Sequence, residues 1–234
     1  MLLSIDIGIK NLSYCVFENK EIIDWGIIDL SDSEKCSCGN ISTFIGTEPY
    51  CTKHKPKKSY ILTKPIEKMK LIDFKKNKLF QKCNSLEECV SITENLSLLR
   101  NNKKNASTID LIQVSRNIQK QFDIKWKDTL FDVVIIENQI SPLASRMKTI
   151  QGMVTQYFVK TVPWIQYISS SNKLKHVKTK MTYQERKKEG IKQCEEGLTE
   201  KWRDFFSKTD KKDDLADCYL QGIWFIANKL ENIK

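Results

Sequence analysis

MLLSIDIGIKNL, residues 1–12, opens the chain with a run of apolar and β-favouring residues that leads straight into Asp6. The run is too short for a helix, so it predicts a central strand that places one carboxylate in a sheet. A buried aspartate destabilises a fold unless a hydrogen bond, a cation or a metal compensates its charge. The alternative is a turn aspartate at the end of a strand. Three later acidic positions that could meet Asp6 favour a functional site.

Length and composition describe an ordinary globular chain. Its 234 residues can form one large domain or a domain with an insert, and 40% of them are hydrophobic. No apolar run reaches the roughly 20 residues that cross a bilayer, and the first residues show no targeting pattern. We therefore expect a soluble, intracellular protein without a membrane partner.

The charge of the chain is strongly positive. It has 39 basic and 29 acidic residues, a formal charge of +10. Such an excess favours polyanionic partners, of which nucleic acid is the commonest, although a merely lysine-rich, soluble chain is the alternative. Residues 171–192 hold eight lysines and arginines against two glutamates, a local charge of +6. Unbalanced clusters bind phosphates by releasing counterions, so we expect a phosphate-binding surface there rather than a solvated helix.

Alternating apolar residues predict further strands. Residues 13–18 and 21–30 predict an antiparallel meander with the first strand, with a bulge at Trp25-Gly26. Residues 132–136, DVVII, predict a buried strand that delivers Glu137 at its carboxyl end. In sheets covered by helices, functional sites lie at such strand ends. Glu137 is therefore a candidate partner of the first acid.

A final helix carries a pair of aspartates near its start. Asp214 and Asp217 stand three residues apart, which places them side by side on one helix face. The adjacent Asp213 faces another side, so we pair Asp214 with Asp217. Two such acids repel each other, and a shared cation would relieve the repulsion. The alternative is an acidic first turn that only complements the helix dipole.

A cysteine-rich stretch interrupts this pattern. It has the spacing C-x-C-x12-C-x2-H, in which two close pairs separated by a loop supply the four ligands of a tetrahedral zinc site. The four residues are Cys36, Cys38, Cys51 and His54. A closed site of this kind is structural rather than catalytic. Three free cysteines beside a lone histidine are the alternative.

The cysteines belong to a longer insert. We expect residues 35–106 to interrupt a core made of residues 1–34 and 107–234. Beyond the zinc site the insert is rich in lysine and predicts a basic helical segment, with a helix near residues 85–100. A nucleic-acid arm and a solvated surface are both compatible with this composition.

The acids together suggest metal-dependent phosphodiester chemistry. Four carboxylates can hold two Mg²⁺ ions roughly 4 Å apart, one activating the attacking water and the other stabilising the leaving oxygen. Magnesium prefers oxygen ligands and keeps several waters, so a few carboxylates suffice, and Mn²⁺ is the expected substitute. The expected ligands are Asp6, Glu137, Asp214 and Asp217.

This order of residues resembles the RuvC-type Holliday junction resolvases of the RNase H-like superfamily, in particular those of poxviruses and other large DNA viruses. The matching motifs are SIDIGIKNL (4–12), IIENQ (135–139), RMKTIQGM (146–153) and KKDDLAD (211–217). The resemblance covers about residues 1–30 and 107–230. It implies an α/β fold, a mixed five-stranded sheet flanked by helices, to which the Cys/His-rich insert is added.

The resemblance also implies an activity. It is that of a homodimeric, Mg-dependent endonuclease that cuts four-way DNA junctions by symmetric nicks, without a nucleotide cofactor. It assigns the catalytic roles to the four acids named above. The residues expected to contact DNA are Lys10, Asn11, Arg146, Lys148, Gln151, Lys173, Lys175 and Lys180. A viral protein of this kind would act at the replication site in the host cell.

Three other functions match parts of the pattern. Another RNase H-like nuclease could use the same carboxylates on RNA–DNA hybrids, flaps or other branched DNA. A non-catalytic DNA-binding relative could work mainly through the zinc insert, although the four acids argue against it. The DIGIKN stretch of residues 6–11 also resembles the first phosphate loop of actin-like ATPases and sugar kinases. Those folds need a second glycine-containing loop, which the sequence does not offer.

Overall fold

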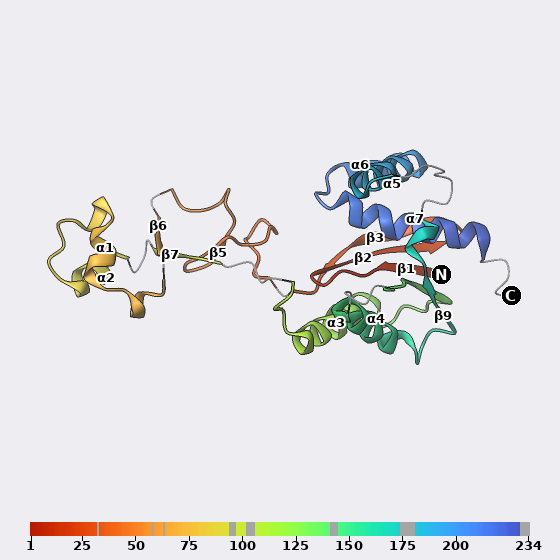
Figure 1. The fold of residues 1–234 in the computed structure, drawn as a ribbon, viewed down its shortest axis with the longest axis horizontal. Coiled ribbons are helices and arrows are strands. Elements are labelled where there is room, and N and C mark those ends of the chain that lie inside the picture. The colour runs from red at the N-terminus through yellow and green to blue at the C-terminus, as the bar shows by residue number, and fades with distance from the viewer. Residues whose placement is uncertain are drawn as a thin grey trace. The chain divides into compact units, whose positions relative to one another are not determined.

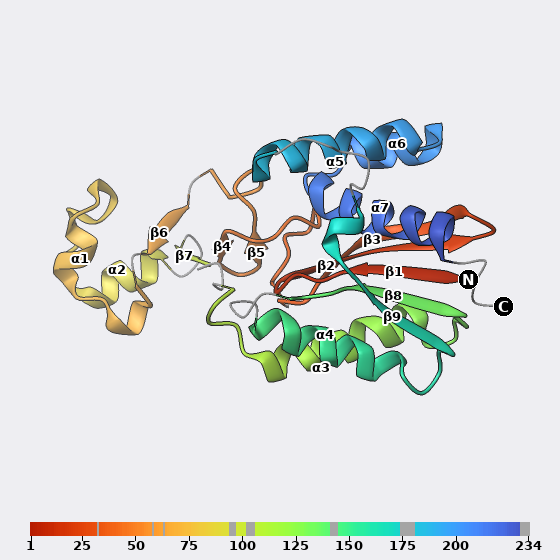
Figure 2. The ribbon, with the colours of Figure 1, turned by 45° about the vertical axis from the view of Figure 1, so that its right-hand side comes forward.

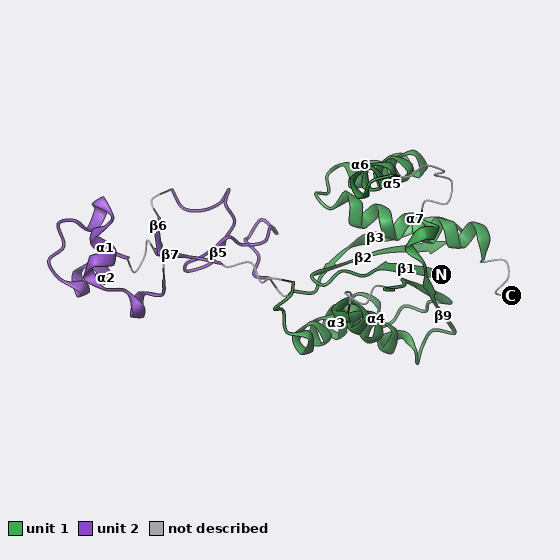
Figure 3. Ribbon diagram, in the orientation of Figure 1, with its two compact units in different colours: residues 1–32, 106–234 green, residues 33–105 purple. Residues whose placement is uncertain are grey.

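The chain folds into two compact units, which Figure 3 colours separately. The main unit comprises Met1–Asp32 and Ala106–Lys234, and the insert unit comprises Ser33–Asn105. The computed structural model describes residues 1–31, 33–57, 59–62, 64–93, 97–101, 106–140, 145–173 and 181–229. Among these residues, no helix has both the length and the apolar character that crossing a bilayer requires.

A mixed five-stranded sheet forms the centre of the main unit (Figure 1). In spatial order its strands are β3 (Glu21–Asp29), β2 (Asn11–Glu18), β1 (Leu2–Asp6), β8 (Val133–Glu137) and β9 (Trp164–Ile168). Strand β1 pairs antiparallel with β2 and parallel with β8, and β8 pairs parallel with β9. The predicted fold class is therefore confirmed.

Helices cover both faces of this sheet (Figure 2). One face packs against α3 (Leu111–Trp126) and α4 (Ser145–Phe158). The other packs against α7 (Lys212–Asn228), which in turn contacts α5 (Tyr183–Gly197) and α6 (Glu200–Ser207). Because both faces are buried, the central strands consist of near-continuous apolar residues rather than alternating polar and apolar ones.

The side-chain alternation of β1 and β8 decides where their acids point. Successive side chains of a strand point to opposite faces, so Asp6 shares the α7 face with Ser4, and Glu137 shares it with Ile135. The parallel register aligns Ser4 with Ile135. Two residues further on, the same register brings Asp6 and Glu137 together at the carboxyl ends of neighbouring strands.

The insert unit has a small sheet and an apolar core of its own. Its strands, in spatial order, are β5 (Pro49–Tyr50), β4 (Phe44–Ile45), β7 (Ser97–Arg100) and β6 (Tyr60–Leu62). Its helices are η1 (Ile66–Lys68), α1 (Leu71–Lys75), η2 (Lys78–Phe80) and α2 (Leu86–Thr93). At the centre of the core, the rings of Phe74 and Phe80 pack edge to face with their centroids 5.3 Å apart.

The helix expected near residues 85–100 is only half correct. It ends at Thr93, and Ser97–Arg100 forms β7 instead. Strand β7 pairs with β4 on one side and β6 on the other, and Leu98 within it is buried. Pairing with two neighbouring strands therefore overrides the local preference of this segment.

The expected bulge at Trp25-Gly26 lies slightly earlier in β3. The register of β2 against β3 shifts between Val16 and Phe17, which leaves Ile23 as the extra residue. Gly26 is not part of the bulge. A Cβ added to it would lie 2.7 Å from the hydroxyl of Tyr14. The glycine leaves room for the tyrosine ring on the neighbouring strand.

Candidate active site

A buried lysine joins acids from three different elements of the main unit. Lys173 directly follows η4 (Ser170–Asn172), and 6% of its side chain is exposed. Its Nζ lies 2.9 Å from Asp6 Oδ1 and 3.2 Å from Glu137 Oε1. The same nitrogen lies 3.4 Å from Asp217 Oδ2 on α7. The ammonium group marks a position where the surrounding carboxylates favour a cation.

Two acids of this cluster, Glu137 and Asp217, have strongly raised pKa values. Burial, followed by repulsion from Asp6, raises the pKa of Glu137 to about 8. Burial also raises the pKa of Asp217 to about 6. Its side chain is still 47% exposed, so it is only partly removed from water. Burial alone would lower the pKa of Lys173, but attraction to the three carboxylates raises it instead. The cluster therefore holds more negative charge than one ammonium group neutralises.

Lys173 and the acids around it line a cleft with a volume of about 700 Å³. The start of α7 brings three aspartates to this cleft. Burial would raise the pKa of Asp213, but its ion pair with Lys187 of α5 lowers it. Burial and repulsion from Asp213 raise the pKa of Asp214, whose cationic contact, Lys211, is 3.9 Å away. The sequence predicts that Asp213 faces away from the site, yet it also lines the cleft. The difference between the two aspartates is that Asp213 is the better neutralised.

Buried hydrogen bonds hold α7 against the strands. Ser13 Oγ of β2 donates to the backbone oxygen of Asp214 at 2.6 Å, and Ser4 Oγ of β1 donates to a backbone oxygen of α7 at 2.7 Å. Gln221 Nε2 donates to Ser4 Oγ at 3.2 Å and to the backbone of β1 at 3.1 Å. Gln221 is fully buried, and its Oε1 has no hydrogen-bond partner among the described residues. This network fixes the acids of α7 relative to those of the sheet.

Basic side chains line the cleft beside the acids. Lys10 belongs to the tight turn after β1, where Gly8 is required because an added Cβ would lie 2.3 Å from the carbonyl oxygen of Asn11. Arg186 and Lys187 reach the cleft from α5. Acids at strand ends with cationic side chains around them suit a bound phosphodiester, whose backbone needs cations close to the reacting group.

The other residues predicted to contact DNA lie in different environments. Lys148 is exposed, whereas Arg146 is half-buried and donates to a backbone oxygen of the main unit. Gln151 is buried, and its Oε1 accepts a hydrogen bond from a backbone N–H after β8 at 3.0 Å, so we withdraw its predicted DNA contact. Lys175 and Lys180 lie outside the described residues.

Sequence reasoning missed the central position of Lys173 and the contribution of Gln221. The sequence predicts Lys173 only near DNA, and nothing local distinguishes it from the other lysines of its segment. Gln221 does carry a signal, because it follows Asp217 by four residues and is a polar residue on the buried apolar face of α7. Lys187 has basic neighbours on both sides, so only the structure shows that it is the one paired with an acid.

The carboxylate cluster fits a hard divalent cation. It offers oxygen ligands, which Mg²⁺ prefers, and its excess negative charge needs cations beyond Lys173. The ligands available are Asp6, Glu137, Asp214 and Asp217.

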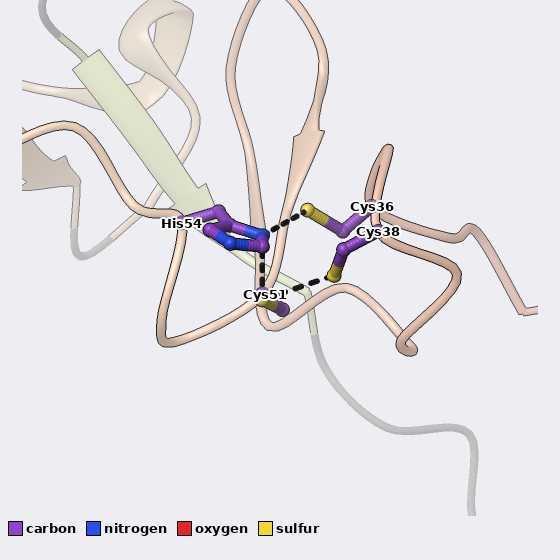
Figure 4. Close-up of side chains that lie close together, drawn as sticks. All are labelled: Cys36, Cys38, Cys51 and His54. Carbon is purple, nitrogen blue, oxygen red and sulfur yellow. Dashed lines mark hydrogen bonds between the residues drawn. The ribbon is translucent and has the colours of Figure 1, made fainter.

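In the insert unit, the four predicted zinc ligands converge (Figure 4). Their ligand atoms all lie within 4.8 Å of one another and belong to Cys36, Cys38, Cys51 and His54. Cys38 Sγ lies 3.7 Å from Cys51 Sγ, and His54 Nδ1 lies 3.6 Å from Cys36 Sγ. In a tetrahedral site with Zn–S bonds of about 2.3 Å, neighbouring sulfurs are about 3.8 Å apart, so the set fits one zinc ion. Gly39, with a φ of +83°, turns the chain after the first pair.

The Cys36 thiol lies where its thiolate form is favoured. Hydrogen bonds from the backbone of Cys38 and Cys51 lower the pKa of Cys36 to about 5. The thiolate is the form that ligates zinc, so the backbone hydrogen bonds favour the protonation state that binds a metal.

Comparison with known sequences gives one curated relative. No model of a known protein family matches the chain. An uncharacterized protein of Acanthamoeba polyphaga mimivirus is 26% identical to it, over 96% of this chain and 74% of that protein.

Two solved structures align with nearly the whole chain. The yeast mitochondrial Holliday junction resolvase Ydc2 aligns with a TM-score of 0.42 and 15% identity, over 96% of this chain and 78% of that one. The fowlpox virus resolvase, solved in a complex with its substrate Holliday junction DNA, aligns with a TM-score of 0.50 and 15% identity, over 98% of each chain. The chain therefore has the fold of the fowlpox virus resolvase, and the resemblance expected from the sequence is confirmed at the level of the fold.

Proposed function

We propose that this protein is a divalent-metal-dependent endonuclease that cuts branched DNA, and that its substrate is the four-way junction. The observation that carries the proposal is the convergence of acids from β1, β8 and α7 around the buried cation of Lys173. The choice of substrate is supported by the fold shared with a resolvase that binds Holliday junction DNA. We further propose that two copies act together as a homodimer, because symmetric nicks in opposite strands need two equivalent sites.

Each group of the cleft has a role in this proposal. The four acids hold the divalent ions, which when bound would activate the attacking water and stabilise the leaving oxygen of the phosphodiester. Lys173 is cationic at neutral pH and keeps Asp6, Glu137 and Asp217 close together against their mutual repulsion. Lys10 and the basic side chains of α5 bind the phosphates on either side of the reacting group.

We also propose that the Cys/His cluster of the insert unit holds a structural zinc ion. Support comes from the interatomic distances, which match the edges of a tetrahedral site. All four ligands come from the protein, which leaves no open position for chemistry. Zinc binding would then stabilise the fold of the insert unit.

The test of the nuclease proposal is cleavage of a synthetic four-way junction in Mg²⁺ beside a matched duplex, a flap and an RNA–DNA hybrid. We expect paired, symmetric nicks in the junction. Asp6→Asn and Glu137→Gln are each expected to lower the cleavage rate by at least about a thousandfold, because losing a metal ligand removes several kcal/mol of transition-state stabilisation. Asp128→Asn, at an exposed acid after α3, is the matched control.

Binding separates the chemistry from the phosphate contacts. Both active-site variants should bind the junction as the unaltered protein does in a gel-shift assay with EDTA, since their phosphate contacts remain. Preferential cleavage of the flap or the hybrid would assign the site to another nuclease activity. Tight junction binding with no cleavage in Mg²⁺ or Mn²⁺ would contradict the proposed catalysis.

A further inference from the structure

The positive charge of the chain is concentrated in the insert unit. Residues 33–105 contain 15 lysines and arginines against seven acids, which gives +8 of the total charge of +10. The main unit is more than twice as long, yet its 24 basic and 22 acidic residues leave only +2. A polyanion attracted by the net charge of this protein is therefore attracted mainly to the insert unit.

Within the insert unit, residues 68–82 carry a net charge of +5. They include six exposed lysines and a single acid, Asp73. We call the six side chains the lysine surface; they are Lys68, Lys70, Lys75, Lys76, Lys78 and Lys82. Asp73 does not neutralise this surface, because its shorter ion pair, at 2.7 Å, is with Lys64, which lies outside it; Lys76 is 3.5 Å away. The other five lysines form no ion pair with any described residue.

The lysine surface is held on a folded scaffold. Met69, Phe74, Phe80 and Cys83 alternate with the lysines along the chain, and all four are buried in the apolar core of the insert unit. The lysines point outward because these neighbours point inward. Pre-ordered cations lose less conformational freedom on binding than those of a flexible tail, so they bind a polyanion more tightly.

We propose that the lysine surface binds the phosphate backbone of duplex DNA, as a second contact distinct from the active-site cleft. The proposal relies on the proposed function only for the choice of DNA as the polyanion. A membrane is a poorer partner, because membrane-binding helices need a continuous exposed apolar face. Here the apolar faces are turned into the core, and residues 68–82 expose only two large apolar side chains, Ile72 and Leu79. Six cations along the segment suit a partner with regularly repeated charges.

The test measures how salt weakens the binding of the full-length protein to duplex DNA. A fluorescent duplex is titrated in EDTA at several KCl concentrations, and binding is followed by fluorescence anisotropy. The quadruple variant Lys70→Gln, Lys75→Gln, Lys78→Gln and Lys82→Gln removes four charges from the lysine surface. The matched control removes four exposed charges from the main unit, with Lys120→Gln, Lys127→Gln, Lys160→Gln and Lys201→Gln. Zinc content and melting curves check that both variants are folded.

The expected result is a change of slope in the first variant alone. Each lost phosphate contact lowers the slope of log K against log salt by about 0.9, so four contacts lower it by about 3 to 4 and weaken binding roughly 100-fold or more at low salt. The control should change the slope by less than about 1. An unchanged slope in the first variant, or an equal change in both, would overturn the proposal. If the slope is unchanged, vesicles containing phosphatidylserine would show whether a membrane is the polyanion instead. Because no cleavage is measured, the result does not depend on the proposed catalysis.

Discussion

Replacing Gly222 with alanine should destabilise the main unit, because this glycine lets α7 lie directly against β2. A Cβ added to Gly222 would lie 2.2 Å from Cε2 and 2.7 Å from Cζ of Phe17. Ordinary van der Waals contacts begin at 3.4 Å, so either the ring or the helix must move by about 1.2 Å. Phe17 is 2% exposed, and its ring also packs against Tyr219, with 6.1 Å between the centroids. Moving the ring away from α7 would therefore disturb its contact with Tyr219.

The size of the effect follows from two opposing contributions. Forcing an extra methyl group into a packed core costs about 1–3 kcal/mol, and this contact lies at the upper end because two ring atoms are too close. Alanine in place of glycine inside a helix contributes about 1 kcal/mol in the opposite direction. The net destabilisation is therefore about 2 kcal/mol, or a fall of roughly 4–8 °C in Tm for a unit of this size.

Gly152 supplies the matched control. It lies within α4, and an added Cβ would meet no atom within 4 Å. Gly152→Ala should therefore show the helix preference alone and raise the stability by about 1 kcal/mol. Both variants are compared by urea titration and by thermal melting, followed by far-UV circular dichroism in the same buffer.

A rescue experiment tests the assigned contact. Phe17→Leu removes the ring edge. It should therefore destabilise the Gly222→Ala variant less than it destabilises the unaltered protein, with a coupling of at least about 1 kcal/mol in the free energy of unfolding. Because α7 carries Asp214 and Asp217, the single variant Gly222→Ala should also slow cleavage. Neutral or increased stability of Gly222→Ala would refute the packing account, and so would the absence of coupling with Phe17→Leu.

The remaining predictions concern charge and metal. Burial raises the pKa of Glu137 from 4.5 to about 8, so the folded metal-free protein keeps a proton there that unfolding releases. The stability that this group contributes should be complete below pH 4.5 and fall by several kcal/mol between pH 4.5 and about 8, since each pKa unit is worth about 1.4 kcal/mol. Urea titrations in EDTA should show this fall, and Glu137→Gln should remove most of it; an equally steep fall in the variant would contradict the assignment. Cys51→Ser should lower both the bound zinc, measured by elemental analysis, and the Tm, while cleavage at low temperature changes little. A protein that contains no zinc and melts as before would exclude the zinc site.

Much of the fold follows from local patterns in the sequence. The apolar run around Ser4 and the DVVII run before Glu137 predict central strands. Successive side chains of a strand point to opposite faces, so consecutive apolar residues are all buried only when both faces of the sheet are covered. That Asp6 and Glu137 share a face depends on the register of β1 against β8, which aligns Ser4 with Ile135. The structure confirms the mixed sheet with helices on both faces. The segment at residues 97–100 could not be predicted in this way, because its strand pairing is decided by β4 and β6, which are distant in sequence.

The linear sequence was enough to identify the residue types that could form a site: acids at two strand ends, a D-x-x-D pair in the last helix, and two pairs of zinc-type ligands. These features depend on local periodicity and spacing, both of which are visible in the linear sequence. The folded structure was needed to show that Lys173 lies among three of the acids, that Gln221 hydrogen-bonds α7 to β1, and that Lys187 forms an ion pair with Asp213. These contacts join elements through packing rather than through spacing. Because many lysines of the chain are equivalent in sequence, only its position in the fold distinguishes Lys173 from the exposed lysines among the described residues.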